Sequence, residues 1–297
     1  MVSPASRRRA ARHLVEAKNY SVSMACKSAG LKRGTYYYQP VLRQGEQELM
    51  RKLYHLVKRY PRSGYRSVTA RLRSEGLVVN HKRVQRLRRL EGLGVPQKQR
   101  KRRRLGASTT VRQIALYPNH VWSWDFIFDR TEDGRALKIL NIVDEYSRKN
   151  IAMEVFRSCK GEHVIQALGR AMLTHGIPGC IRSDNGSEFI NEQVKKWLAE
   201  NGIGISYIKP GSPWENPYVE SFNARLRDES LNRELFTSLM EAKVVLADWR
   251  EEYNNYRPHG ALGYRTPKAV YSTYMKIEKD SSLDKQLSEY SNFALSD

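Results

Sequence analysis

The sequence predicts a mixed α/β domain, a sheet covered by helices, that follows all-α segments of the helix-turn-helix kind. The first observation is that apolar residues up to about position 95 recur only at helical spacing, with glycine and asparagine at the helix ends. The second is that strand-like runs begin after Tyr117 and give three neighbouring segments, after which helices and strands alternate. This order is typical of a mixed sheet flanked by helices.

The basic residues are concentrated in the first part of the chain. The 297 residues have a net charge of +21, but residues 1–114 carry 29 basic and 5 acidic side chains, whereas residues 115–297 carry 23 and 26. A basic segment joined to a near-neutral body attracts a polyanion, and nucleic acid is the commonest one. A merely solvated basic surface is the alternative.

The composition predicts a cytoplasmic protein that associates with the nucleoid and not with a membrane. No apolar run reaches the roughly 18 residues of a membrane helix, and no apolar stretch follows the basic start. The three cysteines are odd in number and lack CxxC spacing. Neither a disulfide framework nor a cysteine zinc site is therefore predicted.

Two stretches of the basic segment have helix-turn-helix spacing. In the first, Ser21 precedes a short helix and Gly30 follows it, before a second segment. A longer helix ended by Pro61 comes next. The second stretch has a helix, a turn at Gly76 and a last helix that begins after Asn80, a good N-cap.

This last helix, about residues 81–91, is amphipathic. Its apolar face is expected to consist of Val84, Leu87 and Leu90. Its opposite face carries Lys82, Arg83, Arg86 and Arg89. Such a cationic face is typical of a recognition helix that enters the DNA major groove, with an ordinary surface helix as the alternative.

A basic linker separates these helices from the α/β body. Residues 97–112 have no apolar period, and we expect them to follow the DNA backbone through cations that include Arg102, Arg103 and Arg104. The predicted parts are an N-terminal helical segment (1–43), a helix-turn-helix domain (44–96), the linker (97–115), the α/β domain (116–235), and a C-terminal helix and tail (236–297).

The α/β body shows strand signals first and helical signals later. Strands are predicted at 121–128, 137–147, 150–156, 180–184 and 204–210. Helices are predicted around Val164 to Met172, at 187–201, at about 216–233 and at about 238–256. The Pro and Gly content of 253–267 predicts an extended tail.

Three acidic residues lie where the predicted elements favour chemistry. Asp125 lies within the apolar strand VWSWDFIF, where a carboxylate costs several kcal/mol unless it is paired or bound to a cation. Asp184 ends another strand, and Glu220 lies on a helix expected to start with Ser212 as N-cap and Pro213 as first residue. Taken singly, an ion pair, a turn and solvation would explain the three acids.

The spacing of these acids resembles that of the DDE transposase and retroviral integrase superfamily. There are 58 residues between the first two acids and 35 between the second and third. SDNGSEF at 183–189 and NPYVESFNARLRDE at 216–229 are similar to motifs of the IS3 family of insertion-sequence transposases. The likeness extends to 64–93 and to YNNYRPHGALGYRTP at 253–267, and so covers nearly the whole chain. It implies a ribonuclease-H-like catalytic core.

The resemblance further implies a metal-dependent DNA transposase. Asp125, Asp184 and Glu220 would hold two Mg²⁺ ions, for which Mn²⁺ can substitute. Water would cleave a transposon end, and the freed 3′-OH would attack another phosphodiester without a covalent protein intermediate. Arg227 and Asn223 follow Glu220 on the same helix face, and we expect them to contact the DNA.

Transposon-end and target DNA are the implied partners. Because two DNA ends are joined, a homo-oligomer, a dimer or higher, is expected. In the family the complete enzyme is often a fusion to an upstream, OrfA-type product with a leucine zipper. This chain shows no such heptads and resembles the downstream, OrfB-type product. It also lacks an HHCC arrangement, so no zinc is predicted.

Two other functions remain open at this point. A DNA-binding regulator or inhibitor of transposition would use the same body without chemistry, and metal-dependent strand cleavage discriminates it from an enzyme. A ribonuclease H would share the metal chemistry but act on RNA–DNA hybrids. Asp129, four residues after Asp125 and hence on the same strand face, is the substitute if Asp125 is not the catalytic acid.

Overall fold

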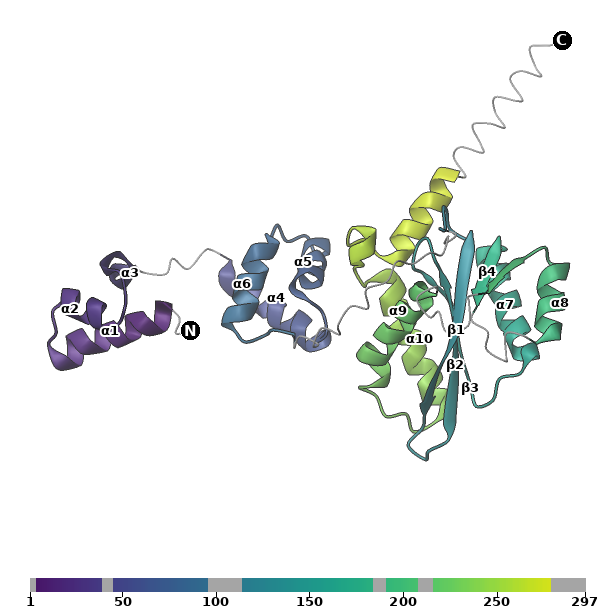
Figure 1. Ribbon diagram of the computed structural model, residues 1–297, viewed down its shortest axis with the longest axis horizontal. Coiled ribbons are helices and arrows are strands. Elements are labelled where there is room, and N and C mark those ends of the chain that lie inside the picture. The colour runs from purple at the N-terminus through teal and green to yellow at the C-terminus, as the bar shows by residue number, and fades with distance from the viewer. Residues whose placement is uncertain (1–3, 39–44, 96–113, 184–190, 208–215, 279–297) are drawn as a thin grey trace, which may run out of the picture. The chain divides into compact units, whose positions relative to one another are not determined.

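The computed structural model describes residues 4–38, 45–95, 114–183, 191–207 and 216–278 (Figure 1). The chain divides into two compact units, Met1–Arg51 and Lys52–Asp297. None of the described helices is both long and apolar enough to pass through a membrane.

The first unit contains α1 (Pro4–Lys18), α2 (Val22–Ser28) and α3 (Arg33–Tyr37). The Ser21 side chain accepts the backbone N–H of Met24, as expected of an N-cap, and Gly30 after α2 has a φ of +60°. The sequence pattern does not indicate α1, because this helix contains several arginines and only a short apolar stripe. Ala11 of that stripe is fully buried.

Helices α4 (Glu46–Arg59), α5 (Tyr65–Ser74) and α6 (His81–Leu90) follow. The Asn80 side chain accepts the N–H of Lys82 at 2.9 Å and so caps α6. Gly76 and Gly92, after α5 and α6, have φ values of +85° and +68°. The predicted caps and turns of this helix-turn-helix segment are confirmed.

Five strands form one sheet within the described residues. They are β1 (Val121–Arg130), β2 (Ala136–Asp144), β3 (Asn150–Phe156), β4 (Cys180–Ser183) and β5 (Gly204–Tyr207). The strand order is β3-β2-β1-β4-β5; β1 to β3 are antiparallel, and β4 and β5 are added in parallel. The mixed sheet is the one that the sequence predicts.

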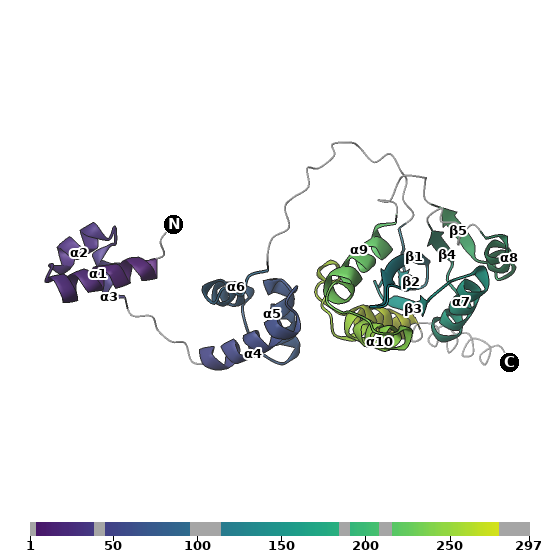
Figure 2. The ribbon, with the colours of Figure 1, turned by 90° about the horizontal axis from the view of Figure 1, so that it is seen from below.

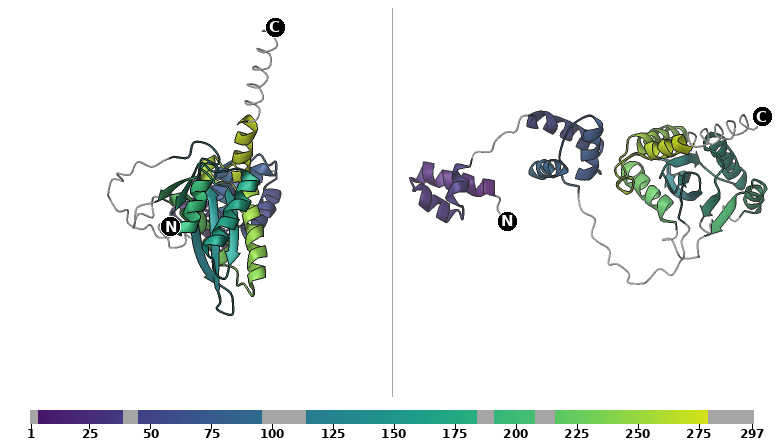
Figure 3. Two further views of the ribbon diagram at one scale, coloured as in Figure 1. Left: turned by 90° about the vertical axis from the view of Figure 1, so that its right-hand side faces the viewer. Right: turned by 90° about the horizontal axis from the view of Figure 1, so that it is seen from above.

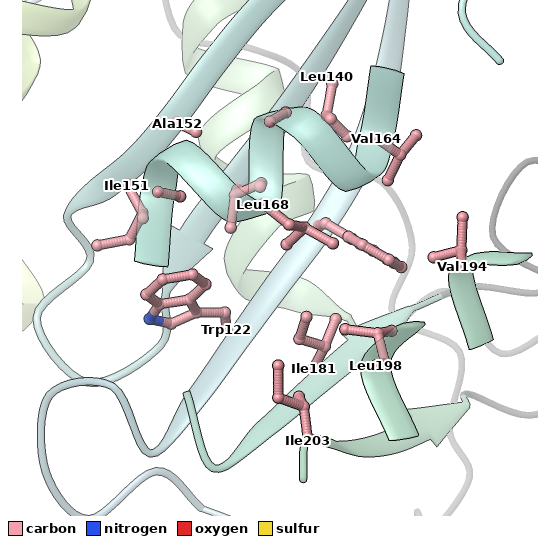
Figure 4. Close-up of a cluster of buried hydrophobic side chains, with 14 of the residues drawn as sticks. Trp122, Leu140, Ile151, Ala152, Val164, Leu168, Ile181, Val194, Leu198 and Ile203 are labelled. Carbon is pink, nitrogen blue, oxygen red and sulfur yellow. The ribbon is translucent and has the colours of Figure 1, made fainter. Parts of the chain in front are cut away.

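Helices cover both faces of this sheet (Figure 2 and Figure 3). The covering helices are α7 (Gly161–His175), α8 (Glu192–Glu200), α9 (Pro217–Leu226) and α10 (Leu239–Asn255). Trp122 and Trp124 pack with residues of α7 and α8 in one core (Figure 4), whereas Ile127 packs with residues of α9 and α10 in the other. Because side chains alternate along a strand, the odd-numbered residues of β1, Asp125 included, face α9.

Two predictions about the helices are wrong. First, α9 begins at Pro217 with Asn216 before it, which agrees with the predicted start at about residue 216 but not with Pro213 as the first helical residue. Ser212 and Pro213 lie outside the described residues. Second, 253–267 is not an extended tail. A 3₁₀ turn, η3 (Gly260–Leu262), interrupts it, and residues 267–278 form a further helix.

Candidate active site

Asp125 lies in the middle of β1, held by a chain of side-chain amides. Its Oδ1 accepts the N–H of Phe126 at 2.8 Å, and its Oδ2 accepts Nδ2 of Asn223 at 2.8 Å. Asn141, its pairing partner on β2, is fully buried and donates Nδ2 to Oδ1 of Asn223 at 2.7 Å. Both ends of the Asn223 amide are thus taken up by protein groups. The sequence did not single out Asn141.

One face of α9 lies along β1 and contacts it at both ends of the helix. Asn216 donates Nδ2 to the carbonyl of Trp124 at 3.3 Å. Arg227, at the start of the π-helical turn η2 (Arg227–Leu231), donates Nη2 to the carbonyl of Phe128 at 3.0 Å. These contacts fix how α9 runs along the strand.

Glu220 belongs to the same face of α9. It lies four residues after Asn216 and three before Asn223, so the three side chains share one side of the helix. Because Asn216 reaches Trp124 and Asn223 reaches Asp125, the intervening turn places Glu220 beside this part of β1.

The Glu220 carboxylate has no cationic partner among the residues that the structure describes. Its residue is exposed, but partial burial of the carboxyl raises the pKa of Glu220. None of the described residues donates a hydrogen bond or forms an ion pair with this side chain. A bound cation would offset the partial loss of hydration.

Asp184, the third predicted acid, lies outside the described residues, and so do Arg102, Arg103 and Arg104. Ser183, directly before Asp184, is buried at the end of β4, the parallel neighbour of β1. Among the described residues no three potential metal ligands form a group. Asp129 accepts the N–H of Arg130, its neighbour in β1.

Asp144, at the end of β2, has a structural role. Its Oδ1 accepts the N–H of Ser147 at 2.7 Å, and its Oδ2 accepts the N–H of Asn119 at 2.8 Å. Burial raises the pKa of Asp144, and these hydrogen bonds act in the opposite direction. This carboxylate closes a turn at the sheet end.

A buried ion pair beside the site was missed by sequence reasoning. Arg182 Nη1 lies 2.6 and 2.7 Å from the two carboxylate oxygens of Glu145, and their side chains are 4% and 0% exposed. Arg182 on β4 pairs with Ser123, two residues before Asp125 and on the same face of β1. The only signal in the sequence is an arginine within an apolar strand.

The cationic face of α6 is largely as predicted. Its exposed side chains are Lys82, Arg86 and Arg89, and Arg83 is half-buried. Leu90 was expected on the apolar face but is 67% exposed, so that prediction is wrong. Arg88 is buried instead and donates to the carbonyls of Leu93 and Ser63, each at 2.8 Å. On a helical wheel, position 88 lies about 40° from Val84 and position 90 about 120° from it, so Arg88 and not Leu90 shares the buried face.

Known proteins share this arrangement of domains. Residues 116–213 and 201–267 each match a family described as an integrase core domain, and residues 42–103 match a family described as an HTH-like domain. The matches cover the sheet with its helices and the α4 to α6 segment, respectively.

Three relatives from bacterial insertion sequences cover most of the chain. It is 36% identical over 278 residues to the insertion element IS476 uncharacterized 39.2 kDa protein of Xanthomonas euvesicatoria (94% of this chain, 80% of the relative). It is 39% identical over 254 residues to the insertion element IS407 uncharacterized 31.7 kDa protein of Burkholderia multivorans (85% and 91%). It is 31% identical over 245 residues to the transposase for insertion sequence element IS904 of Lactococcus lactis (77% and 94%).

The expected fold class is confirmed, since a mixed α/β core of the ribonuclease-H-like kind follows all-α helices. The relatives match over most of their own length, and the domain matches agree with the helices and the sheet. The chain therefore belongs to the IS3 family of insertion-sequence transposases.

Proposed function

We propose that this transposase uses Asp125, Asp184 and Glu220 to hold two Mg²⁺ ions, cleaves the ends of its element and joins the freed 3′-OH to another phosphodiester. The observation that supports this most is the hydrogen bond between Asn223 and Asp125, because it sets the helix carrying Glu220 against the strand carrying Asp125. Asp184 directly follows Ser183 of the neighbouring strand, and one residue step is about 3.8 Å.

The chemistry of the donors suits a hard divalent cation. Carboxylate oxygens are the ligands that Mg²⁺ and Mn²⁺ prefer. The raised pKa of Glu220 and the lack of a described cation beside it leave a carboxylate that gains from metal binding. When bound, the two ions would activate the attacking oxygen and stabilise charge on the leaving oxygen.

The protein's own side chains orient these acids and the DNA. The amide of Asn223 and the N–H of Phe126 each hold one oxygen of Asp125, so the carboxylate needs little reorganisation when a ligand binds. The exposed Arg227 is held at the far end of β1, where its remaining N–H groups can hold a DNA phosphate. Glu220 is exposed, so a DNA strand can approach it.

We assign DNA recognition to the basic segment before the sheet. The exposed cations of α6 would read transposon-end DNA, and the linker cations would contact its phosphates. Joining two ends to a target needs at least two copies of the chain on the DNA. An upstream, OrfA-type product is a further proposed partner.

Single neutralising substitutions test the proposed acids. We expect Asp125→Asn, Asp184→Asn and Glu220→Gln each to abolish Mg²⁺-dependent cleavage and joining of a duplex that carries the element's end. DNA affinity measured by gel shift should stay near that of the wild type, because the acids do not bind DNA in the absence of metal.

Asp129→Asn is the matched control, since it removes the same charge from the same face of β1 four residues away. It should retain cleavage. If an acid variant cleaves normally, that acid does not belong to the site, and if only Asp129→Asn is inactive, Asp129 takes the place of Asp125. A chain that binds end DNA but never cuts it would instead be a regulator.

A further inference from the structure

A cationic pocket lies on α9 next to Glu220, one of the proposed acids. Its volume is about 360 Å³, and Ser221, the residue after Glu220, forms part of its wall. Other residues come from β2 and the turn that follows it, from Pro217, Tyr218 and Arg225 of α9, and from the end of α10 and the segment after it. The side chains that matter are those of Arg148, Arg225, Arg257 and His259. Nothing in the proposed metal chemistry uses this pocket.

The positive charge of the pocket is only partly compensated. Arg257 pairs with Glu229 at 2.5 Å. Within the described part of the chain, Arg148 and Arg225 have no carboxylate partner. Arg148 instead lies 3.7 Å from the ring centroid of Tyr218, and Arg225 donates to the carbonyl of Ser221 at 2.7 Å. Arg148 also donates Nη1 to the carbonyl of Glu145 and interacts electrostatically with Asp144. Both guanidinium groups still keep N–H donors without an acceptor among the described residues.

His259 supplies a second, independent sign of a ligand. It lines the pocket, is 5% exposed, and its buried Nε2 has no hydrogen-bond partner in the described part of the chain. A buried polar atom normally has a partner. Burial, Arg257 and Arg225 together lower the pKa of His259 to about 3, so the field of the arginines reaches this ring. An anion in the pocket would offset that field.

We propose that this pocket binds a phosphate of the DNA backbone beside the proposed acids. Arginine is the side chain best suited to phosphate, because its planar group donates several hydrogen bonds in one direction. Ser221, which lines the pocket, directly follows Glu220 in α9, so a phosphate bound there would lie close to that acid. The choice of DNA over free phosphate rests on the proposed function, whereas the affinity for a phosphate group does not.

A pair of substitutions of the same size tests the pocket without touching its arginines. Ala261 is exposed and lines the pocket. Ala261→Glu would place a carboxylate among the arginines, whereas Ala261→Gln fills the same space without charge. The measurement is the affinity of the full chain for a labelled DNA duplex in metal-free buffer at several salt concentrations.

Each phosphate contact contributes about 0.9 to the slope of log affinity against log salt. We expect Ala261→Glu to lose about one contact's worth of slope, about 0.9, and Ala261→Gln to keep the wild-type slope. Arg225→Gln should lose the same amount. Lys243→Gln removes an exposed cation of α10 that lies outside the pocket lining, and it should not change the slope.

Several outcomes would overturn the proposal. Unchanged slopes in Ala261→Glu and Arg225→Gln would exclude a DNA phosphate, and an equal loss in Ala261→Gln would show that bulk and not charge matters. Calorimetric titration with inorganic phosphate shows whether the pocket binds free phosphate or a phosphate of the DNA backbone. Saturable binding that Ala261→Glu abolishes, with unchanged DNA slopes, would assign the pocket to free phosphate. These binding experiments contain no metal and so do not depend on cleavage. The proposed function is tested separately, by the loss of Mg²⁺-dependent cleavage in the acid variants.

Discussion

Asn223 donates its side-chain amide to Oδ2 of Asp125 across 2.8 Å and thereby ties α9 to β1. Asn141 on β2 donates its Nδ2 to Oδ1 of the same amide at 2.7 Å. The strand that carries one proposed acid and the helix that carries another are therefore connected by neutral side chains. Such a connection can set the separation of Asp125 and Glu220 before any cation binds.

Asn223→Ala should slow cleavage about 10-fold to 100-fold, the usual effect of removing a group that orients a metal ligand. It should also raise the Mg²⁺ concentration needed for half-maximal rate, which a purely structural role would not do. Unfolding free energy should fall by about 1 to 3 kcal/mol, because Asn141 Nδ2 loses its acceptor. Cleavage rates over a Mg²⁺ series, with urea unfolding alongside, measure both effects.

Asn232→Ala is the control for this experiment, because Asn232 is an exposed amide at the end of η2. It should leave the rate and the Mg²⁺ dependence unchanged. Normal Mg²⁺ dependence in Asn223→Ala, despite lower stability, would limit Asn223 to a packing role.

Arg88 and Arg86, two residues apart on α6, should affect different properties when replaced by glutamine: Arg88 the stability and Arg86 the binding of DNA. Arg88→Gln removes hydrogen bonds to the partly buried carbonyls of Leu93 and Ser63 and should lower the unfolding free energy by about 1 to 3 kcal/mol. Arg86→Gln should change stability by less than about 0.5 kcal/mol. It should weaken binding to end DNA, with about 1 to 3 kcal/mol of lost discrimination if Arg86 contacts a base.

Urea unfolding and competition binding with end and random DNA distinguish these expectations. Arg89→Gln is a second exposed variant of the same helix and should behave like Arg86→Gln. Equal weakening on both DNAs would make these arginines phosphate contacts. Unaltered DNA binding in both exposed variants would remove α6 from the interface.

Features encoded locally were predictable from the sequence. Asn80 and Ser21 cap helices through their own side chains, and the apolar, strand-forming run VWSWDFIF of β1 is read from neighbouring residues alone. The position of Asp125 within a buried strand followed from the same local pattern. These parts of the fold needed no knowledge of distant contacts.

Features that depend on strand register or on helix placement were not predictable. The contact between Asn141 and Asn223 joins residues 82 positions apart, and it exists only because α9 packs on this face of the sheet. Arg182 and Glu145 meet because β4 adds in parallel beside β1.

Acidification should destabilise the protein through two histidines that are held uncharged. Burial, then Lys149, lowers the pKa of His175 to about 4, and the pKa of His259 is about 3. An unfolded histidine has a pKa of about 6.5, so below that pH the unfolded chain binds protons that the folded chain does not. Unfolding free energy should therefore fall as the pH decreases from about 6.5 toward 4.

The loss for His259 is at most about 1.4 kcal/mol per pH unit, and it is smaller for His175, whose partial exposure screens its neighbours. Urea unfolding at several pH values measures the slope. His259→Gln and His175→Gln should each flatten it, while His55→Gln, which removes an exposed imidazole of α4, serves as control. An unaltered slope in His259→Gln would contradict the expectation.

Replacing one member of the buried pair of Glu145 and Arg182 should lower the unfolding free energy strongly, whereas replacing both should lower it much less. Arg182→Met or Glu145→Gln alone leaves one buried group without its partner, which costs about 3 to 5 kcal/mol of unfolding free energy. The double variant should recover most of this loss, because neither charge then remains buried. Urea unfolding of all four proteins measures the coupling, and losses below about 1 kcal/mol in both single variants would contradict it.

Cleavage by the double variant then shows what the pair does beyond stability. Arg182 precedes Asp184 by two residues and lies on the strand next to β1. If stability recovers while cleavage stays low, the pair acts by fixing the end of β4 from which Asp184 continues. If both recover, any well-packed side chains at these positions suffice to present that acid.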